Sequence, residues 1–150
     1  MAAREIRAPS GSVPAVRLAR SIADAIVAHA RAEAPIEACG LVIGSDVAAC
    51  GGVALRYVAC RNRLAGRSIY EIHPDDLATA VYAADDAGEE VWGIVHSHVT
   101  VPAVPSTTDI GLASWPQAVQ LLVSLGGAEP ELRAWWIRDG EAVELPLKVA

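Results

Sequence analysis

Two histidines and an aspartate within one fourteen-residue stretch carry the side chains best suited to chemistry in this sequence. His96 and His98 follow a short apolar run, residues 91–95, which predicts a buried strand. Side chains two residues apart on a strand point to the same face, so the two imidazoles would lie side by side and could bind one metal ion. Asp109 would complete a set of two histidines and one carboxylate. Such a set leaves one coordination position open for water, which is typical of catalytic zinc sites.

Each part of this pattern also has a purely structural interpretation. A His-x-His pair is common and by itself indicates little about metal binding. Ser106 and Asp109 have the spacing of a capping box, in which the serine binds a free N–H at a helix start and the helix dipole favours the acid. The apolar segment from Ile110 to Ala113 agrees with a helix at that point. Capping and metal ligation by Asp109 do not exclude one another.

Composition limits the class of protein. The chain has 150 residues, 53% of them hydrophobic, which predicts one domain with a substantial core. No apolar run approaches the roughly 20 residues of a membrane span. The net charge of −6 argues against nucleic acid as a partner. Residues 1–12 lack the apolar region of a signal peptide, so we predict a disordered tail, a domain over residues 13–150 and a cytoplasmic location.

Apolar periodicity and turn residues predict a mixed α/β fold, with one sheet flanked by helices. A helix is expected over residues 18–33, ended by Pro35, and a second one starts at residues 73–76 and runs to Ala87. The expected strands, besides the one before His96, cover residues 13–17, 39–43, 68–72, 119–125, 132–138 and 142–149. Residues 47–60 are expected to form one or two strands, with a hairpin at Gly51-Gly52.

The charges at Glu37 and in residues 61–67 can each be interpreted as solvent-exposed or as functional. Glu37 is a single charge where the chain reaches a predicted strand, and taken alone it favours an exposed glutamate at a strand end. Residues 61–67 form a basic loop with three arginines. This loop is either a solvated connection or a contact surface for a carboxylate-bearing partner. The first is favoured because charge runs mostly serve solvation.

Together, these residues form the pattern Glu37…His96-x-His98-x7-Ser106-x2-Asp109. The pattern resembles the JAMM/MPN+ zinc metallopeptidases, which cleave peptide or isopeptide bonds at the C-termini of ubiquitin-like proteins. The resemblance implies a cytidine deaminase-like fold with a central mixed sheet, and one Zn²⁺ per chain. By position it implies zinc ligation by His96, His98 and Asp109. It also implies that Glu37 is the general base and that Ser106 is a donor to the tetrahedral oxyanion.

The resemblance extends to a branch of the family. Val99 stands where many members carry proline, which implies an altered loop rather than lost activity, because this position ligates nothing. The chain lacks room for the long insertions of larger eukaryotic members and looks like the small bacterial branch. That branch implies a sulfur-carrier protein with a C-terminal Gly-Gly as partner, and the release of cysteine in cysteine biosynthesis.

Other functions remain open at this point. The same site could remove ubiquitin-like modifiers from protein lysines. A non-catalytic MPN scaffold that binds partners is a second alternative, although scaffolds of that kind have typically lost ligands. A related DNA-repair-associated family shares the metal pattern, but the acidic balance of this chain counts against it. The sequence does not decide between a monomer and a homo-oligomer.

Overall fold

The structure, a computed structural model, describes residues 15–150. Along this part of the chain the elements are β1 (Val16–Leu18), α1 (Arg20–Glu33), β2 (Cys39–Gly44), the short 3-10 helix η1 (Ala48–Cys50), β3 (Ala54–Cys60), α2 (Pro74–Asp86), β4 (Glu90–His98), α3 (Thr107–Leu112), β5 (Val119–Ser124), β6 (Glu131–Arg138), β7 (Glu141–Leu145) and β8 (Leu147–Val149).

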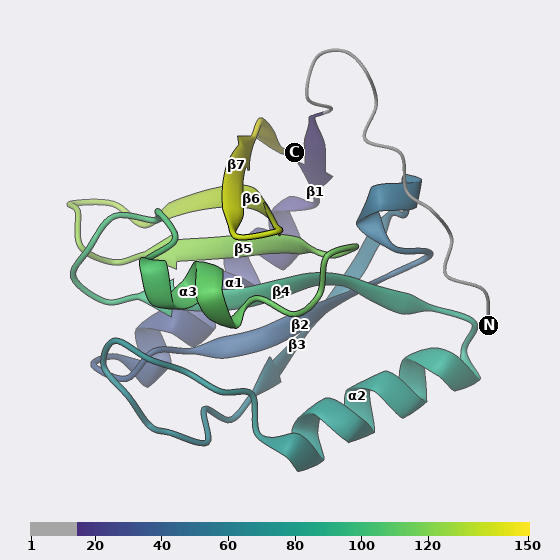
Figure 1. Cartoon of the computed structure of the whole chain (residues 1–150), viewed down its shortest axis with the longest axis horizontal. Helices are drawn as coiled ribbons and strands as arrows, with labels where there is room; N and C mark the ends of the chain where they lie inside the picture. The colour runs from purple at the N-terminus through teal and green to yellow at the C-terminus, as the bar shows by residue number, and fades with distance from the viewer. Residues whose placement is uncertain (1–14) are drawn as a thin grey trace.

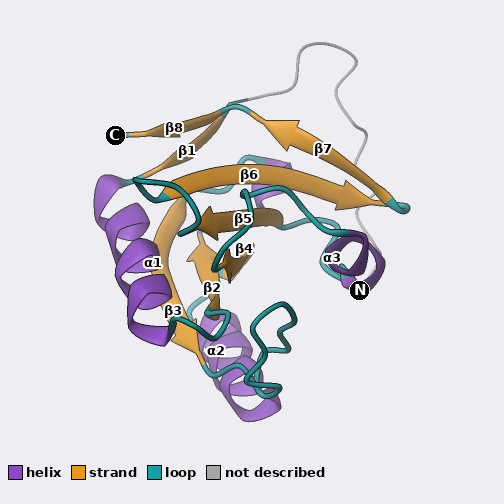
Figure 2. Cartoon of the chain, turned by 90° about the vertical axis from the view of Figure 1, so that its left-hand side faces the viewer, coloured by secondary structure: helices purple, strands orange, loops and turns teal. Residues whose placement is uncertain are grey.

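A six-stranded mixed sheet forms the centre of the fold, in the order β3-β2-β4-β5-β6-β7 (Figure 1). The β4–β5 pair is parallel, and the other neighbours in this sheet are antiparallel. β1 and β8 pair separately as a small parallel ribbon. Figure 2 shows α1 on one side of the sheet, at the left, and α2 and α3 on the other side, at the bottom and at the right. The predicted α/β class, a mixed sheet flanked by helices, is confirmed.

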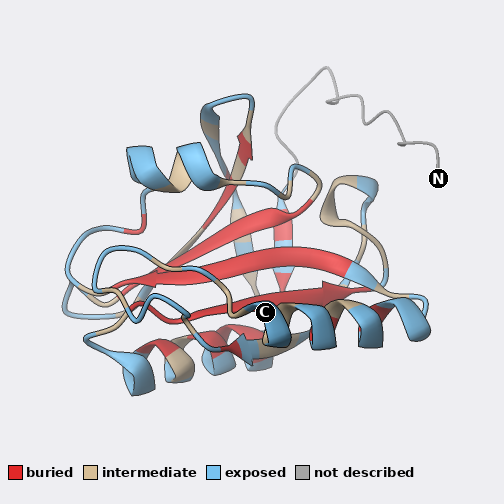
Figure 3. Cartoon of the chain, turned by 60° about the horizontal axis from the view of Figure 1, so that its bottom comes forward, coloured by how far each residue is buried: buried red, intermediate tan, exposed pale blue. Residues whose placement is uncertain are grey.

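The middle strands are mostly apolar on both faces because helices cover both, and their buried polar residues are His96, Ser97 and His98 on β4 and Gln120 and Ser124 on β5. Every residue of β2 and β5 is buried, and so is β4 from Val91 to its end (Figure 3). α1 packs Ile22 and Ile26 against one face of the sheet, while α2 packs Ala80 and Ala84 against the other. The C-terminal end of β4, with its two histidines and Ser97, is therefore a polar segment buried among apolar strands.

Several predicted boundaries are wrong for reasons of long-range contact. Leu18 belongs to β1 rather than to the first helix, because it pairs with Val149 at the other end of the chain. The segment of residues 47–60 does not fold back on itself at Gly51-Gly52. Its first part is η1, and its second part, β3, pairs with β2 instead.

Residues 68–72 form a loop and not the predicted strand. The side-chain amide of Asn62 binds the backbone of this segment, accepting from the Glu71 N–H at 3.1 Å and donating to the Ile69 carbonyl at 3.2 Å. These backbone groups are thus not available for a strand partner, and a single bridge between Asn62 and Ile72 remains. The last predicted strand is divided into β7 and β8 at Pro146, which lacks an N–H.

Two further expectations concern the ends of the chain and its location. The predicted tail of residues 1–12 lies outside the described residues, as does the start of the predicted strand at Val13. Within residues 15–150, no helix is long and apolar enough to span a membrane.

Candidate metal centre

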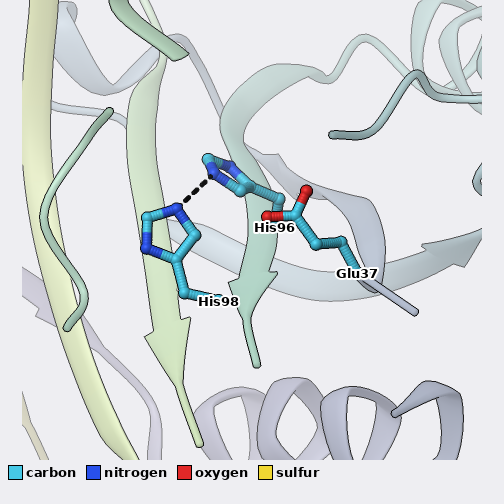
Figure 4. A group of neighbouring side chains, drawn as sticks. All are labelled: Glu37, His96 and His98. Carbon is cyan, nitrogen blue, oxygen red and sulfur yellow. Dashed lines mark hydrogen bonds between the residues drawn. The ribbon is translucent and has the colours of Figure 1, made fainter. Parts of the chain in front are cut away.

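The C-terminal end of β4 brings two buried histidines together. His96 is 1% exposed and His98 is 3% exposed, and the strand that carries them lies between β2 and β5. Their Nε2 atoms are 3.3 Å apart (Figure 4). The intervening Ser97 points the other way, as strand alternation requires, and its hydroxyl accepts a 2.7 Å hydrogen bond from the Ala38 N–H. The structure places the two imidazoles side by side, as predicted from their spacing on the strand.

Asp109 reaches the same point from the first turn of α3. Ser106 is the N-cap: its hydroxyl accepts from the Asp109 N–H at 3.0 Å, and its own N–H donates to Asp109 Oδ2 at 2.9 Å. The same Oδ2 lies 3.3 Å from His96 Nε2 and 3.1 Å from His98 Nε2. The capping box is therefore confirmed, and it aims the carboxylate at the histidines.

Glu37 completes the group from the segment before β2. Its N–H donates to the Gly66 carbonyl at 2.8 Å, and its carbonyl accepts from the Asn62 amide at 3.0 Å. The residue is only 3% exposed, so the interpretation as an exposed glutamate is wrong. One ligand atom each from Glu37, His96 and His98 lie within 4.8 Å of one another, and Figure 4 shows the carboxylate beside the rings.

Hydrogen bonding settles the tautomer of His98. Its Nδ1 lies 2.7 Å from the Pro102 carbonyl, which can only accept, so Nδ1 carries the hydrogen. In the neutral ring Nε2 carries only a lone pair, so its 3.1 Å contact with Asp109 Oδ2 is favourable only when a proton or a metal ion lies between the two atoms. Burial alone would lower the pKa of His98, but its hydrogen bonds to Asp109 and Pro102 and the charge of Asp109 raise it. The site thus attracts either a proton or a metal cation.

The other titratable groups are consistent with this. Burial lowers the pKa of His96, which favours the neutral ring, although its contact with Asp109 acts in the opposite direction. Burial would raise the pKa of Asp109, but its contacts with both histidines hold it below the usual range. Burial raises the pKa of Glu37 to about 7, opposed by His98 and assisted by the charge of Asp109. Among the described residues, Glu37 Oε2 and His96 Nδ1 are buried polar atoms without a hydrogen-bond partner.

Some contributors to the site had no signal in the sequence. The Tyr70 ring stacks on His96, with centroids 4.4 Å apart and planes inclined by 19°. Tyr70 lies in a segment predicted as a strand, and no local pattern relates it to the histidines. The same holds for Asn62 and the Pro102 carbonyl. Ser97 could have been found, because alternation along β4 places it opposite the histidines, toward the segment that carries Glu37.

Two cavities adjoin the cluster. The larger one, about 360 Å³, lies between the loop before α2 and α3, and its lining includes Tyr70 and Asp109. The smaller one, about 240 Å³, has Glu37, His98 and Ser106 in its lining. A substrate could therefore extend to both sides of the histidines, with the two carboxylates facing different sides.

Comparison with known proteins gives a consistent result. The Prok-JAB family, described as prokaryotic homologs of the JAB domain, matches residues 19–138. The CysO-cysteine peptidase of Mycobacterium tuberculosis is 33% identical over 140 residues, covering 93% of this chain and 94% of that protein. The desampylase of Haloferax volcanii is 36% identical over 116 residues, covering 73% of this chain and 81% of that protein.

Solved structures share the fold. A protein from Desulfitobacterium hafniense superposes with a TM-score of 0.78 at 27% identity, covering 89% of this chain and 92% of the other. A JAB1/MPN domain protein from Archaeoglobus fulgidus superposes with a TM-score of 0.57 at 22% identity, covering 88% and 98%. The second likeness concerns the fold alone.

Proposed function

Since the chain belongs to the prokaryotic JAB domain family and is a hydrolase of that type, we propose that it is a zinc-dependent peptidase acting on a ubiquitin-like sulfur-carrier protein. It hydrolyses the bond after the C-terminal Gly-Gly of the carrier and releases cysteine. The observation that carries this proposal is the convergence of Glu37, His96, His98 and Asp109 at the buried end of β4.

The donor atoms suit a zinc ion. The Nε2 atoms of both histidines and Asp109 Oδ2 are separated by 3.1 to 3.3 Å. Ligands 2.0–2.2 Å from a tetrahedral zinc ion are about 3.3 Å or slightly more from each other, so little movement is needed. Three protein ligands leave one position open, which is the arrangement of a catalytic site. The Pro102 carbonyl keeps the His98 ring oriented, a support that metal-binding histidines usually have.

The remaining residues account for proton transfer and charge stabilisation. When bound, zinc lowers the pKa of water to about 7 and polarises the scissile carbonyl. Glu37 takes the proton of the attacking water and returns it to the leaving amine. The Ser106 hydroxyl uses a lone pair in the helix cap, so its O–H is still available. It donates to the carbonyl oxygen as negative charge develops there.

Removal of ubiquitin-like modifiers from protein lysines is the second candidate. Relatives named desampylase favour it. It uses the same site residues and differs in the leaving amine. A non-catalytic scaffold is disfavoured, because His96, His98, Asp109, Glu37 and Ser106 are all present.

The test is mass spectrometry of a sulfur-carrier protein that ends in Gly-Gly-Cys. We expect the loss of one cysteine with the zinc-loaded protein, inhibition by a chelator and recovery with added zinc. Glu37→Gln should bind zinc normally and lose at least about 100-fold in activity, because general acid–base catalysis contributes roughly 10²–10⁴-fold. An intact carrier after incubation with zinc-loaded wild type would contradict cysteine release. A lysine-linked conjugate, cleaved in a parallel reaction, would then support the second candidate.

A further inference from the structure

The smaller cavity lies between the basic loop, residues 61–67, and the segment that joins β4 to α3. Its lining combines Glu37 and Ser106 with Arg67 and with apolar side chains of the joining segment, including Val101 and Val104. Its volume of about 240 Å³ is below the roughly 300–1,000 Å³ of most small-molecule pockets. The cavity is therefore of a size for one amino acid, and Arg67 is its one lysine or arginine.

The three arginines of the basic loop have different surroundings. Arg61 pairs with Asp76 on α2, with Nη2 and Oδ1 2.9 Å apart, and Arg63 pairs with Glu71. Arg67 is exposed and makes no ion pair within residues 15–150. Two arginines of the loop are thus engaged in ion pairs, while Arg67 lines the cavity and has no ion-pair partner among residues 15–150.

The basic loop is hydrogen-bonded to the backbone of Glu37 through two residues that precede Arg67, Asn62 and Gly66. The Gly66 carbonyl accepts the Glu37 N–H at 2.8 Å, and Asn62 binds the Glu37 carbonyl at 3.0 Å. These two hydrogen bonds fix the loop relative to Glu37. The backbone of Arg67 is consequently held close to that of Glu37, and both residues line the same cavity.

The role of Glu37 in proton transfer indicates on which side of the histidines the leaving group lies. Glu37 protonates the leaving amine, so the leaving group must lie on the side of Glu37. Glu37 lines the smaller cavity, whereas the larger cavity has Asp109 in its lining and does not include Glu37. The smaller cavity therefore receives the residue that follows the scissile bond.

We propose that Arg67 binds the α-carboxylate of this leaving residue, so that the enzyme removes a single C-terminal amino acid. This rests on the proposed peptidase function and decides between its two candidates. A C-terminal residue carries a free carboxylate, which a guanidinium binds through paired hydrogen bonds. A lysine side chain in an isopeptide bond carries none. Val101 and Val104, both about half exposed at 53% and 44%, offer an apolar wall to a short side chain.

The hydrolysis is balanced with these groups alone. The water oxygen adds to the glycine carbonyl carbon and the C–N bond breaks. Glu37 moves one water proton to the amine nitrogen, and the second proton, lost when the new carboxyl group ionises, completes the ammonium group of the leaving residue. The products are a carrier ending in a glycine carboxylate and a free amino acid, whose own carboxylate stays paired with Arg67 until release.

The test compares two substrates that differ in one group. Both are sulfur-carrier proteins ending in Gly-Gly-Cys, one with a free C-terminal carboxylate and one with a carboxamide. For zinc-loaded wild type we expect kcat/KM to be about 10- to 100-fold higher for the carboxylate, as is typical when a hydrogen-bonded charge is removed. Arg67→Gln should abolish this preference by slowing the carboxylate substrate alone. Arg63→Gln, which changes the charge of the same loop equally, should retain it.

A binding measurement makes the result independent of turnover. Calorimetry with Glu37→Gln should show the same ratio of affinities for the two substrates, and Glu37→Gln/Arg67→Gln should show none. Equal affinities, or equal slowing of both substrates by Arg67→Gln, would overturn the proposal and indicate that Arg67 contacts the body of the carrier. A clear affinity ratio without any cleavage would leave Arg67 as a carboxylate site and contradict the peptidase function instead.

Discussion

The two halves of the candidate metal centre are built in different ways. The histidines stand on β4, a central strand with neighbours on both sides, and are almost completely buried. Asp109 stands on α3, a six-residue helix in which no residue is buried. The position of the histidines follows from the whole sheet, whereas the position of Asp109 follows from a capping box and a few contacts.

The fold alone therefore fixes the two histidine donors, whereas a bound metal would help to fix the Asp109 donor. The sheet holds two donors rigidly, as a precise site requires. α3 is attached by the partial burial of Ile110 and Ala113 against the cluster that contains Trp135. Metal binding couples to the order of its ligand segments, so α3 should gain more order from the metal than β4 does.

The largest expected effect comes from removing one donor from each half. His96→Ala and Asp109→Ala should both lose stoichiometric zinc and activity. In the presence of a chelator, however, His96→Ala should lower the free energy of unfolding by about 3 kcal/mol, because it removes a buried ring from the core and from its stack with Tyr70. Asp109→Ala should cost less, about 1 kcal/mol, because it removes a hydrogen-bonded carboxylate at a helix start rather than a ring from the core. Elemental analysis and urea denaturation measure both quantities.

Thr107→Ala is the control for this comparison, because Thr107 is an exposed residue in the same turn as Asp109. It should leave zinc content and activity near those of the wild type. Equal destabilisation by His96→Ala and Asp109→Ala would contradict the contrast between the halves. Normal zinc content in Asp109→Ala would reduce Asp109 to a capping residue.

Ser106 sharpens the comparison because it serves both structure and chemistry in the α3 half. Ser106→Ala removes the cap and the O–H donor, and Ser106→Gly removes the donor while glycine remains acceptable at an N-cap. We expect both variants to lose about 10²–10³-fold in kcat, the usual effect of one oxyanion donor. Only Ser106→Ala should also lose about 1 kcal/mol of stability. Activity in Ser106→Gly close to that of the wild type would show that the serine acts through the cap alone.

The histidine half was predictable from local sequence because strand alternation is a local rule. The same is true of the Ser106–Asp109 box, since its two hydrogen bonds join residues three apart. Glu37 differs. Its own neighbours indicate an exposed strand end, and its burial depends on Asn62 and Gly66, which are distant in sequence. Its role was implied by family resemblance rather than by periodicity.

The loop before α2 was the least predictable region for a related reason. Residues 68–72 alternate like a strand, but the amide of Asn62 occupies backbone groups that a strand would use for pairing. When a side chain takes the place of a paired strand, the alternation of apolar and polar residues does not reveal it. The stacking of Tyr70 on His96 depends on the conformation of this loop, so the sequence pattern does not predict the stacking either.

The smallest effect that we expect to be measurable concerns Asn62, which ties the loop before α2 to the backbone of Glu37. Its amide donates to the carbonyls of Glu37 and Ile69, and its oxygen accepts from the N–H groups of Leu64 and Glu71. Asn62→Asp keeps the size and the acceptor but removes both donors, so the Glu37 carbonyl would face a carboxylate.

A displaced general base lowers the rate without affecting the metal ligands, and we expect kcat to fall about 10-fold with unchanged zinc content. Arg63→Gln, in the same loop, should leave kcat within about twofold, because an exposed ion pair contributes little. A loss of zinc in Asn62→Asp would mean that the loop supports the histidines rather than Glu37. An unchanged kcat would mean that Ser97, which binds the Ala38 N–H from β4, is sufficient to position the base, so that the sheet rather than the loop fixes Glu37.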